Sequence, residues 1–82
     1  MDEASMSIWV PLISELLIRD IKDGTLSMPK YVDEIDFIIK DFVYSYMGVE
    51  KMDITYPKTY RQIKYIIVKS IKGDIQDDKR KS

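Results

Sequence analysis

The stretch YPKTYRQIKYIIVKSIK, residues 56–72, decides whether the chain is all helical or mixes helix with strand. It is rich in Ile, Tyr and Val, residues that favour strands. Its apolar positions do not alternate, however, and the run 66–68 would place apolar neighbours on both faces of a strand. The residues that recur at the three-to-four spacing of a buried helix face are Tyr60, Ile63, Ile67 and Ile71. We therefore predict a helix here, capped by Thr55, with Pro57 in its first turn and Gly73 at its end.

Two blocks that precede this stretch carry the same helical signature. Residues 8–23 form the first, with Pro11 in its first turn and Gly24 where a left-handed C-terminal cap is expected. Its apolar stripe consists of Trp9, Leu12, Ile13, Leu16, Leu17 and Ile21. Residues 28–47 form the second, with Ser27 as its N-cap, Pro29 in its first turn and Gly48 at its end. Its stripe consists of Tyr31, Ile35, Ile38, Phe42 and Tyr46, widened by Val32, Ile39 and Val43.

These blocks predict an all-α fold, a small three-helix bundle with a frayed polar tail over residues 74–82. The 82 residues fit one domain, 1–82, with the second helix central. The predicted core consists of Trp9, Leu12, Leu16, Ile35, Ile38, Phe42, Ile63 and Ile67.

The second and third blocks resemble each other at an offset of 28 residues. Residues 27–30, SMPK, match residues 55–58, TYPK, and residues 35–39 match residues 63–67 in the same register. Two interpretations are open: an internal repeat, or chance combined with the shared way in which helices begin.

The composition argues against an enzyme. The chain has no Cys and no His, and its three glycines stand apart at 24, 48 and 73, so the usual general base, thiol nucleophile and phosphate loop are missing. The carboxylates of Asp33, Glu34 and Asp36 are interpreted as an exposed helix start. We expect no catalytic residue, no cofactor, no metal and no small-molecule substrate.

The same composition bears on where the chain works. A small domain without disulfides favours a cytoplasmic or nuclear setting over secretion. The most apolar stretch, residues 8–18, is too short to span a membrane, and the acidic start MDEAS does not resemble a secretory signal.

Charge is distributed unevenly along the chain. Residues 1–50 carry a net charge of −6 and residues 51–82 a net charge of +5. Either the two halves neutralise each other in the fold, or the basic end faces an acidic partner or nucleic acid.

Helical geometry places the basic residues of the third block on one face, opposite its apolar stripe. The predicted partner-binding residues on this face are Lys58, Arg61, Tyr65, Lys69 and Lys72. Cations around an aromatic ring can contact phosphates and stack on a base, or meet an acidic groove on a protein. The alternative is a solvated face.

The second helix carries two aromatic residues, Phe37 and Tyr44, on its predicted polar side. They are candidates for self-association in a homodimer, unless a neighbouring helix of the same chain covers them.

Together these features predict a helical protein-interaction module that self-associates and acts as an adaptor or regulator by binding another protein. The alternative is a nucleic-acid-binding regulator that uses the basic face of the third helix.

Overall fold

The computed structural model describes residues 2–72, and every regular element among them is a helix. The order along the chain is α1 (Glu3–Ser7), α2 (Val10–Lys22), α3 (Val32–Met47), α4 (Met52–Thr55) and α5 (Pro57–Ser70). The all-α fold is therefore confirmed, and the strand alternative for the last block is excluded. The predicted stop at Gly73 and the predicted tail lie outside the described residues.

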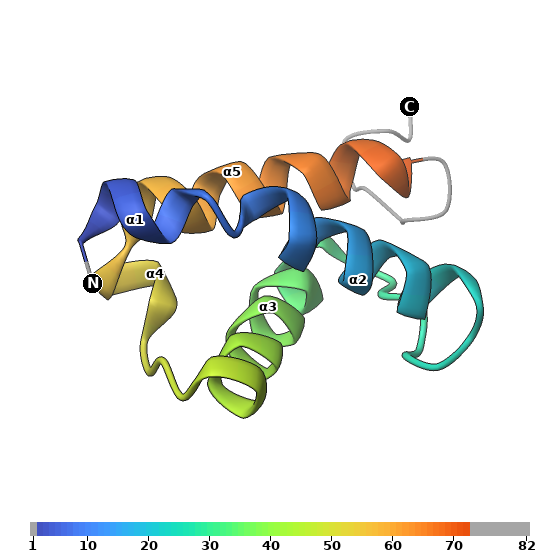
Figure 1. Ribbon diagram of the computed structural model, residues 1–82. Coiled ribbons are helices and arrows are strands. Elements are labelled where there is room, and N and C mark those ends of the chain that lie inside the picture. Colours follow the sequence, from blue (N-terminus) through green and yellow to red (C-terminus); the bar gives the residue numbers. More distant parts are fainter. Residues whose placement is uncertain (1, 73–82) are drawn as a thin grey trace.

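The last helix, rather than the second of the three predicted ones, is the centre of the fold. Helix α5 packs against α1, α2, α3 and α4. In Figure 1, α1 and α2 follow each other along one side of α5, and α3 crosses steeply below them. Helix α4 connects the end of α3 to the start of α5. The prediction of a central second helix is wrong because α5 packs extensively on both α2 and α3, which touch each other little. The short helices α1 and α4 then add further contacts to α5.

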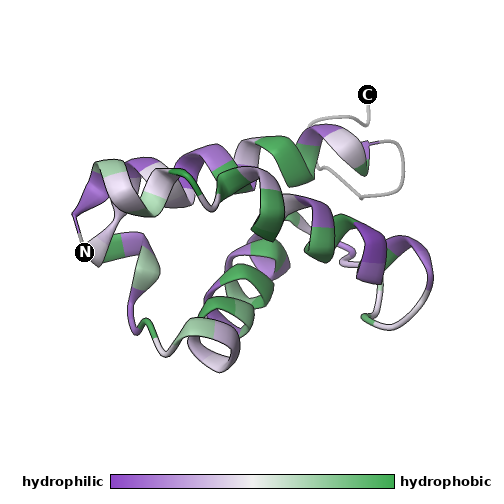
Figure 2. Ribbon diagram, viewed as in Figure 1, coloured by the Kyte–Doolittle hydropathy of each residue, from purple (hydrophilic) through white to green (hydrophobic). Residues whose placement is uncertain are grey.

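Each long helix buries one apolar line, and Figure 2 shows hydrophobic and hydrophilic segments alternating along the ribbon. The buried apolar residues are Met6, Val10, Ile13, Leu17, Ile21, Ile35, Ile39, Val43, Met52, Tyr60, Ile63, Ile67 and Ile71. Of the predicted core, Ile35, Ile63 and Ile67 are confirmed.

Of the other predicted core residues, Trp9, Ile38 and Phe42 pack against the edge of the core, and Leu12 and Leu16 lie outside it. Leu12 is 43% exposed. The half-buried ones are Trp9, Leu16, Ile38 and Phe42. In α2 and α3 two neighbouring apolar lines run along the helix, and both have the helical spacing. Periodicity does not say which line faces the core, and the fold buries the neighbouring one.

The helix starts explain the remaining differences. Helix α2 begins at Val10 rather than residue 8, and α1, which was not predicted, precedes it. Residues 8–9 separate the two helices because Pro11 has no N–H with which to continue the ladder from α1 into α2. Helix α3 begins at Val32 rather than residue 28, since Tyr31 is extended (φ −131°, ψ 156°) and Pro29 is buried ahead of the helix. The predicted cap at Ser27 is therefore wrong. Thr55 ends α4 and does not cap α5.

Two helix ends were predicted correctly. Gly24 and Gly48 have φ values of +88° and +71°, the left-handed conformation that glycine adopts without steric cost. At the end of α3 the Gly48 N–H donates to the Tyr44 carbonyl at 2.9 Å.

The offset of 28 residues is visible in the fold as a shared register. Ile35 and Ile63 are fully buried at equivalent positions, and so are Ile39 and Ile67. The inward faces of α3 and α5 are therefore built alike, and residues 28 apart outside the core lie on equivalent outward faces.

Candidate functional site

Four of the five predicted partner-binding residues lie on one exposed face of α5, and Lys72 comes two residues after the helix ends at Ser70. Lys58, Arg61, Tyr65, Lys69 and Lys72, which we call the basic stripe, are all exposed, and the Tyr65 side chain is 64% exposed. The four residues on α5 lie opposite Ile63 and Ile67, because residues three, four or seven apart share a helix face. The Lys69 Nζ lies 5.6 Å from the centre of the Tyr65 ring, a cation–π contact that partly orders the two side chains.

The basic stripe has no carboxylate partner within residues 2–72. The ion pairs in this part of the chain are Arg19–Asp20, Lys40–Asp53 and Lys64–Asp36. Two of these pairs join the acidic and the basic half of the chain. In Lys40–Asp53 the acidic half supplies the cation, and in Lys64–Asp36 the basic half supplies it. Among the described residues, therefore, mutual neutralisation does not account for the charge asymmetry, and the cations of the stripe face solvent.

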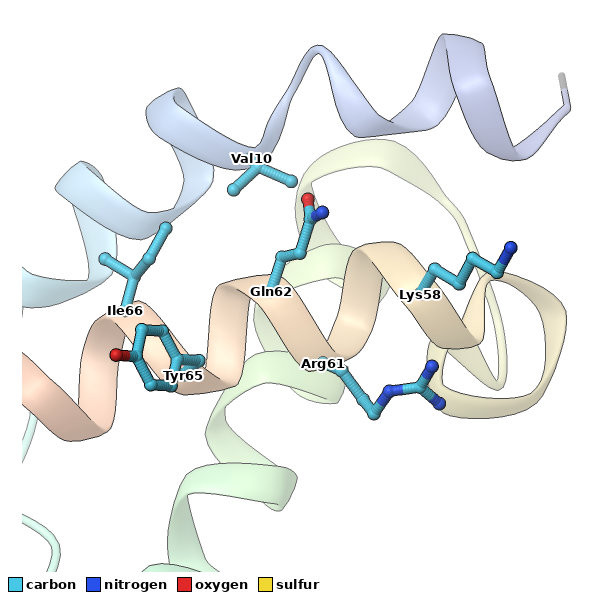
Figure 3. Close-up of a pocket in the computed structure, with 6 residues that line it drawn as sticks. All are labelled: Val10, Lys58, Arg61, Gln62, Tyr65 and Ile66. Carbon is cyan, nitrogen blue, oxygen red and sulfur yellow. The ribbon is translucent and has the colours of Figure 1, made fainter.

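A shallow groove of about 430 Å³ borders the basic stripe. Its lining residues are Val10, Lys58, Arg61, Gln62, Tyr65 and Ile66. Figure 3 shows five of these side chains on α5, while Val10 approaches from α2. The groove thus combines an apolar floor from two helices with the cations of Lys58 and Arg61 at its edge.

A second hollow, of about 340 Å³, continues along the seam between α2 and α5. Its lining residues are Pro11, Ser14, Glu15, Ile18, Arg19 and Ile66. Ile66 lines both hollows, so the apolar path runs along the seam. The buried Ser14 Oγ has no hydrogen-bond partner among the described residues.

Sequence reasoning found the basic stripe and missed the groove. The stripe depends only on spacing within one helix. The groove requires Val10 and Ile66 to meet across two helices that are far apart in sequence, and no local pattern records that meeting. The one available signal was that Ile66 flanks the buried line of α5.

The two aromatic residues of the predicted self-association surface are exposed on α3. Phe37 is 70% exposed and Tyr44 is 54% exposed, so no helix of residues 2–72 covers them. Asp33 and Asp41 are exposed on the same face. We call these four residues the acidic stripe. Two neighbouring charged side chains form ion pairs within the chain: Lys40 with Asp53 (Nζ–Oδ2 3.6 Å) and Asp36 with Lys64 (Nζ–Oδ1 3.0 Å).

A polar contact fastens α3 to α5 beneath these surfaces. The Tyr60 hydroxyl donates to the Asp36 carboxylate, which also pairs with Lys64. Burial, followed by the hydrogen bond to Asp36, raises the pKa of Tyr60 above its ordinary value. Tyr60 therefore remains a protonated donor across the physiological pH range.

Within the described part of the chain, no group of three or more His, Cys, Asp or Glu is placed to hold a metal ion. None of the helices there is both long and apolar enough to cross a bilayer. Comparison of the chain with protein-family models, with curated proteins and with solved structures gives no match.

Proposed function

We propose that the chain is a small helical protein-interaction module that acts as an adaptor or regulator. Its binding surface is the basic stripe together with the groove between α2 and α5. The observation that carries this proposal is that unpaired cations stand beside an apolar groove and an exposed tyrosine. The partner that fits this chemistry is an amphipathic segment with acidic and apolar side chains.

The groove favours a helical or extended protein segment. Helix-in-groove recognition places apolar side chains on a hydrophobic floor and charged side chains at the rim. Here Val10 and Ile66 supply the floor and Lys58 and Arg61 supply the rim. Tyr65 is the aromatic anchor, because tyrosine and arginine are enriched among the residues that dominate binding at protein interfaces.

Nucleic acid is the less favoured partner. The net charge of the chain is −1, so its overall field does not attract a polyanion from a distance. A charged phosphate backbone also gains no binding free energy from an apolar floor, whereas an apolar protein side chain is stabilised by burial there. The basic stripe alone supports nucleic-acid binding, and the experiment below separates the two partners.

Binding rather than catalysis is the proposed activity, because the chain has neither the imidazole nor the thiol on which nucleophilic catalysis most often depends. A cytoplasmic or nuclear setting is part of the proposal. It rests on the absence of cysteine in a domain this small.

The test compares three fluorescent probes: an acidic amphipathic peptide of about 18 residues with Phe and Leu on one face, the same peptide with Lys in place of its acids, and a random DNA oligonucleotide, single-stranded and duplex. Binding is measured by anisotropy at low and at moderate salt. We expect the acidic peptide alone to bind, with an affinity that falls gently with salt. Tyr65→Ala should weaken it about tenfold, as loss of an aromatic anchor does.

A second variant tests the charges. Replacing Lys58, Arg61, Lys69 and Lys72 with Gln should leave the free energy of unfolding nearly unchanged and abolish peptide binding. The matched control replaces Lys22 and Lys51, exposed cations on other elements, and should bind like the wild type. DNA binding that falls steeply with salt would replace the proposal with a nucleic-acid function. Equal binding by the four-site variant would reduce the stripe to a solvated face.

A further inference from the structure

The outward faces of α3 and α5 carry the same pattern with opposite charge. The acidic stripe has an aromatic ring between two acids, Asp33, Phe37 and Asp41, at intervals of four residues. The basic stripe has an aromatic ring between two cations, Arg61, Tyr65 and Lys69, at the same intervals. The two sets lie 28 residues apart, and this is also the offset that relates the buried faces of the two helices.

Equal spacing makes the two stripes complementary in shape and in charge. Four residues advance a helix by about 6 Å, so both patterns repeat at the same distance along their axes. Two such helices that cross at about −50°, the angle at which their rows of every fourth residue align, bring the rings together and each acid near a cation. The match holds for a parallel and for an antiparallel arrangement, because each pattern is symmetric about its ring.

Two of the remaining stripe residues extend the match. In the antiparallel arrangement Tyr44, seven residues after Phe37, lies near Lys58, seven residues before Tyr65. This contact places a lysine against an exposed aromatic ring, which is attractive. The 54% exposure of Tyr44 leaves its ring free for such a contact.

The two stripes do not meet within one chain. Helices α3 and α5 pack together through their apolar lines, which places the stripes on their far sides. Within residues 2–72 no ion pair joins one stripe to the other. A contact between them therefore requires two molecules.

We infer that the acidic stripe on α3 of one copy docks on the basic stripe on α5 of a second copy. This inference rests on the proposed function, because it names an occupant for the same surface. The contact is head-to-tail: each copy uses two different surfaces, so a free stripe remains at either end and further copies can add. Two helix faces bury less area than the standard stable interface, so the association is weak and readily reversed.

The test uses sedimentation of the full chain up to about 500 µM, a range suited to interfaces below the standard size. One variant disables α3, with Asp33→Asn, Phe37→Ala and Asp41→Asn. The other disables α5, with Arg61→Gln, Tyr65→Ala and Lys69→Gln. As the concentration rises, we expect the wild type to form species larger than a dimer and each variant to remain monomeric. An equimolar mixture of the two variants should form a 1:1 dimer and stop there, since it contains a single intact pair of stripes.

The controls keep each outcome decisive. Circular dichroism and thermal unfolding verify that both variants fold, and charge-only versions without Phe37→Ala or Tyr65→Ala replace any variant that does not. Glu50→Gln with Lys22→Gln, exposed changes outside both stripes, should associate like the wild type. Association by the variant disabled in α5 would overturn the inference in favour of a like-with-like contact through α3. A monomeric wild type that still binds the acidic peptide would overturn the second copy alone, and loss of both would overturn the proposed function as well.

Discussion

Helices α3 and α5 share a register but begin in opposite ways. The first turn of α3 contains Asp33 and Glu34, and the Glu34 Oε1 accepts the Lys30 N–H at 2.9 Å. The first turn of α5 contains no acid. Its carboxylate comes from α1, where the Glu3 Oε2 accepts the Thr59 N–H at 2.7 Å and the Thr59 hydroxyl at 2.8 Å.

This difference separates a helix specified locally from one that depends on a distant segment. Free N–H groups at a helix start need an acceptor, and a negative charge there is favourable. Helix α3 supplies the negative charge from its own first turn, and its Glu34 N–H donates to the nearby Tyr31 carbonyl at 3.1 Å. Helix α5 obtains both from a residue 56 positions away, held by a helix of five residues that would not persist alone. The start of α5 is therefore stabilised only when α1 is packed against it.

The largest expected effect compares the inward faces. Ile63 and Ile39 are both fully buried, and both substitutions to Ala remove the same atoms. Because α5 is covered on several sides, Ile63→Ala should cost about 4 kcal/mol, near the upper end for such changes, and Ile39→Ala about 2–3 kcal/mol. Urea unfolding measures both. Equal losses would contradict a central α5.

The next effect compares the two helix starts. Glu3→Ala leaves the Thr59 N–H and hydroxyl buried without an acceptor, at a cost of about 2 kcal/mol. Glu34→Ala removes the acceptor of the Lys30 N–H only, and water can take its place. The loss of stability should therefore be about 0.5 kcal/mol. The same unfolding experiment measures the pair. The double variant Glu3→Ala with Thr59→Ala should lose less stability than the sum of the losses of the two single variants. A loss equal to that sum would show that the contact is absent.

This contrast also explains what sequence reasoning could predict. The existence of three long helices, their ends at Gly24 and Gly48 and the exposure of the basic stripe follow from spacing and local chemistry. The role of Glu3 does not, because its partner Thr59 lies 56 residues away. The predicted stripe of α2 contained its buried line, but the predicted core took Leu12 and Leu16 from that stripe instead of Ile13 and Leu17, for a related reason. Leu12 and Ile13 are equally apolar, and only the position of α5 decides that Ile13 turns inward.

A smaller effect tests the polar contact that joins the two helices. The pKa of Tyr60 is raised above its ordinary value by burial and by the hydrogen bond to Asp36. Above pH 10 the unfolded chain loses this proton while the folded chain keeps it, so stability falls as pH rises. For one proton the slope is at most about 1.4 kcal/mol per pH unit. Tyr60→Phe should remove this part of the slope and cost about 1 kcal/mol at neutral pH.

The measurement is urea unfolding from pH 9 to 11.5 on wild type and Tyr60→Phe. Tyr44→Phe is the matched control, because Tyr44 is exposed and has no such contact among the described residues. An unchanged slope in Tyr60→Phe would place the alkaline loss of stability on other groups.

The smallest effect compares the first turns of the two helices, which carry opposite charge. Asp33 and Lys58 are each the second residue of their helix, where the helix dipole favours an anion. Asp33→Asn should therefore destabilise the chain by about 0.3 kcal/mol, and Lys58→Gln should stabilise it by a similar amount. Both side chains are exposed, so salt screens both effects, and at about 1 M salt the two variants should match the wild type. Thermal unfolding at low and high salt measures the differences. If Lys58→Gln destabilised the chain at low salt, Lys58 would have a favourable contact within its own molecule, and the basic stripe would be less available to a partner than its exposure indicates.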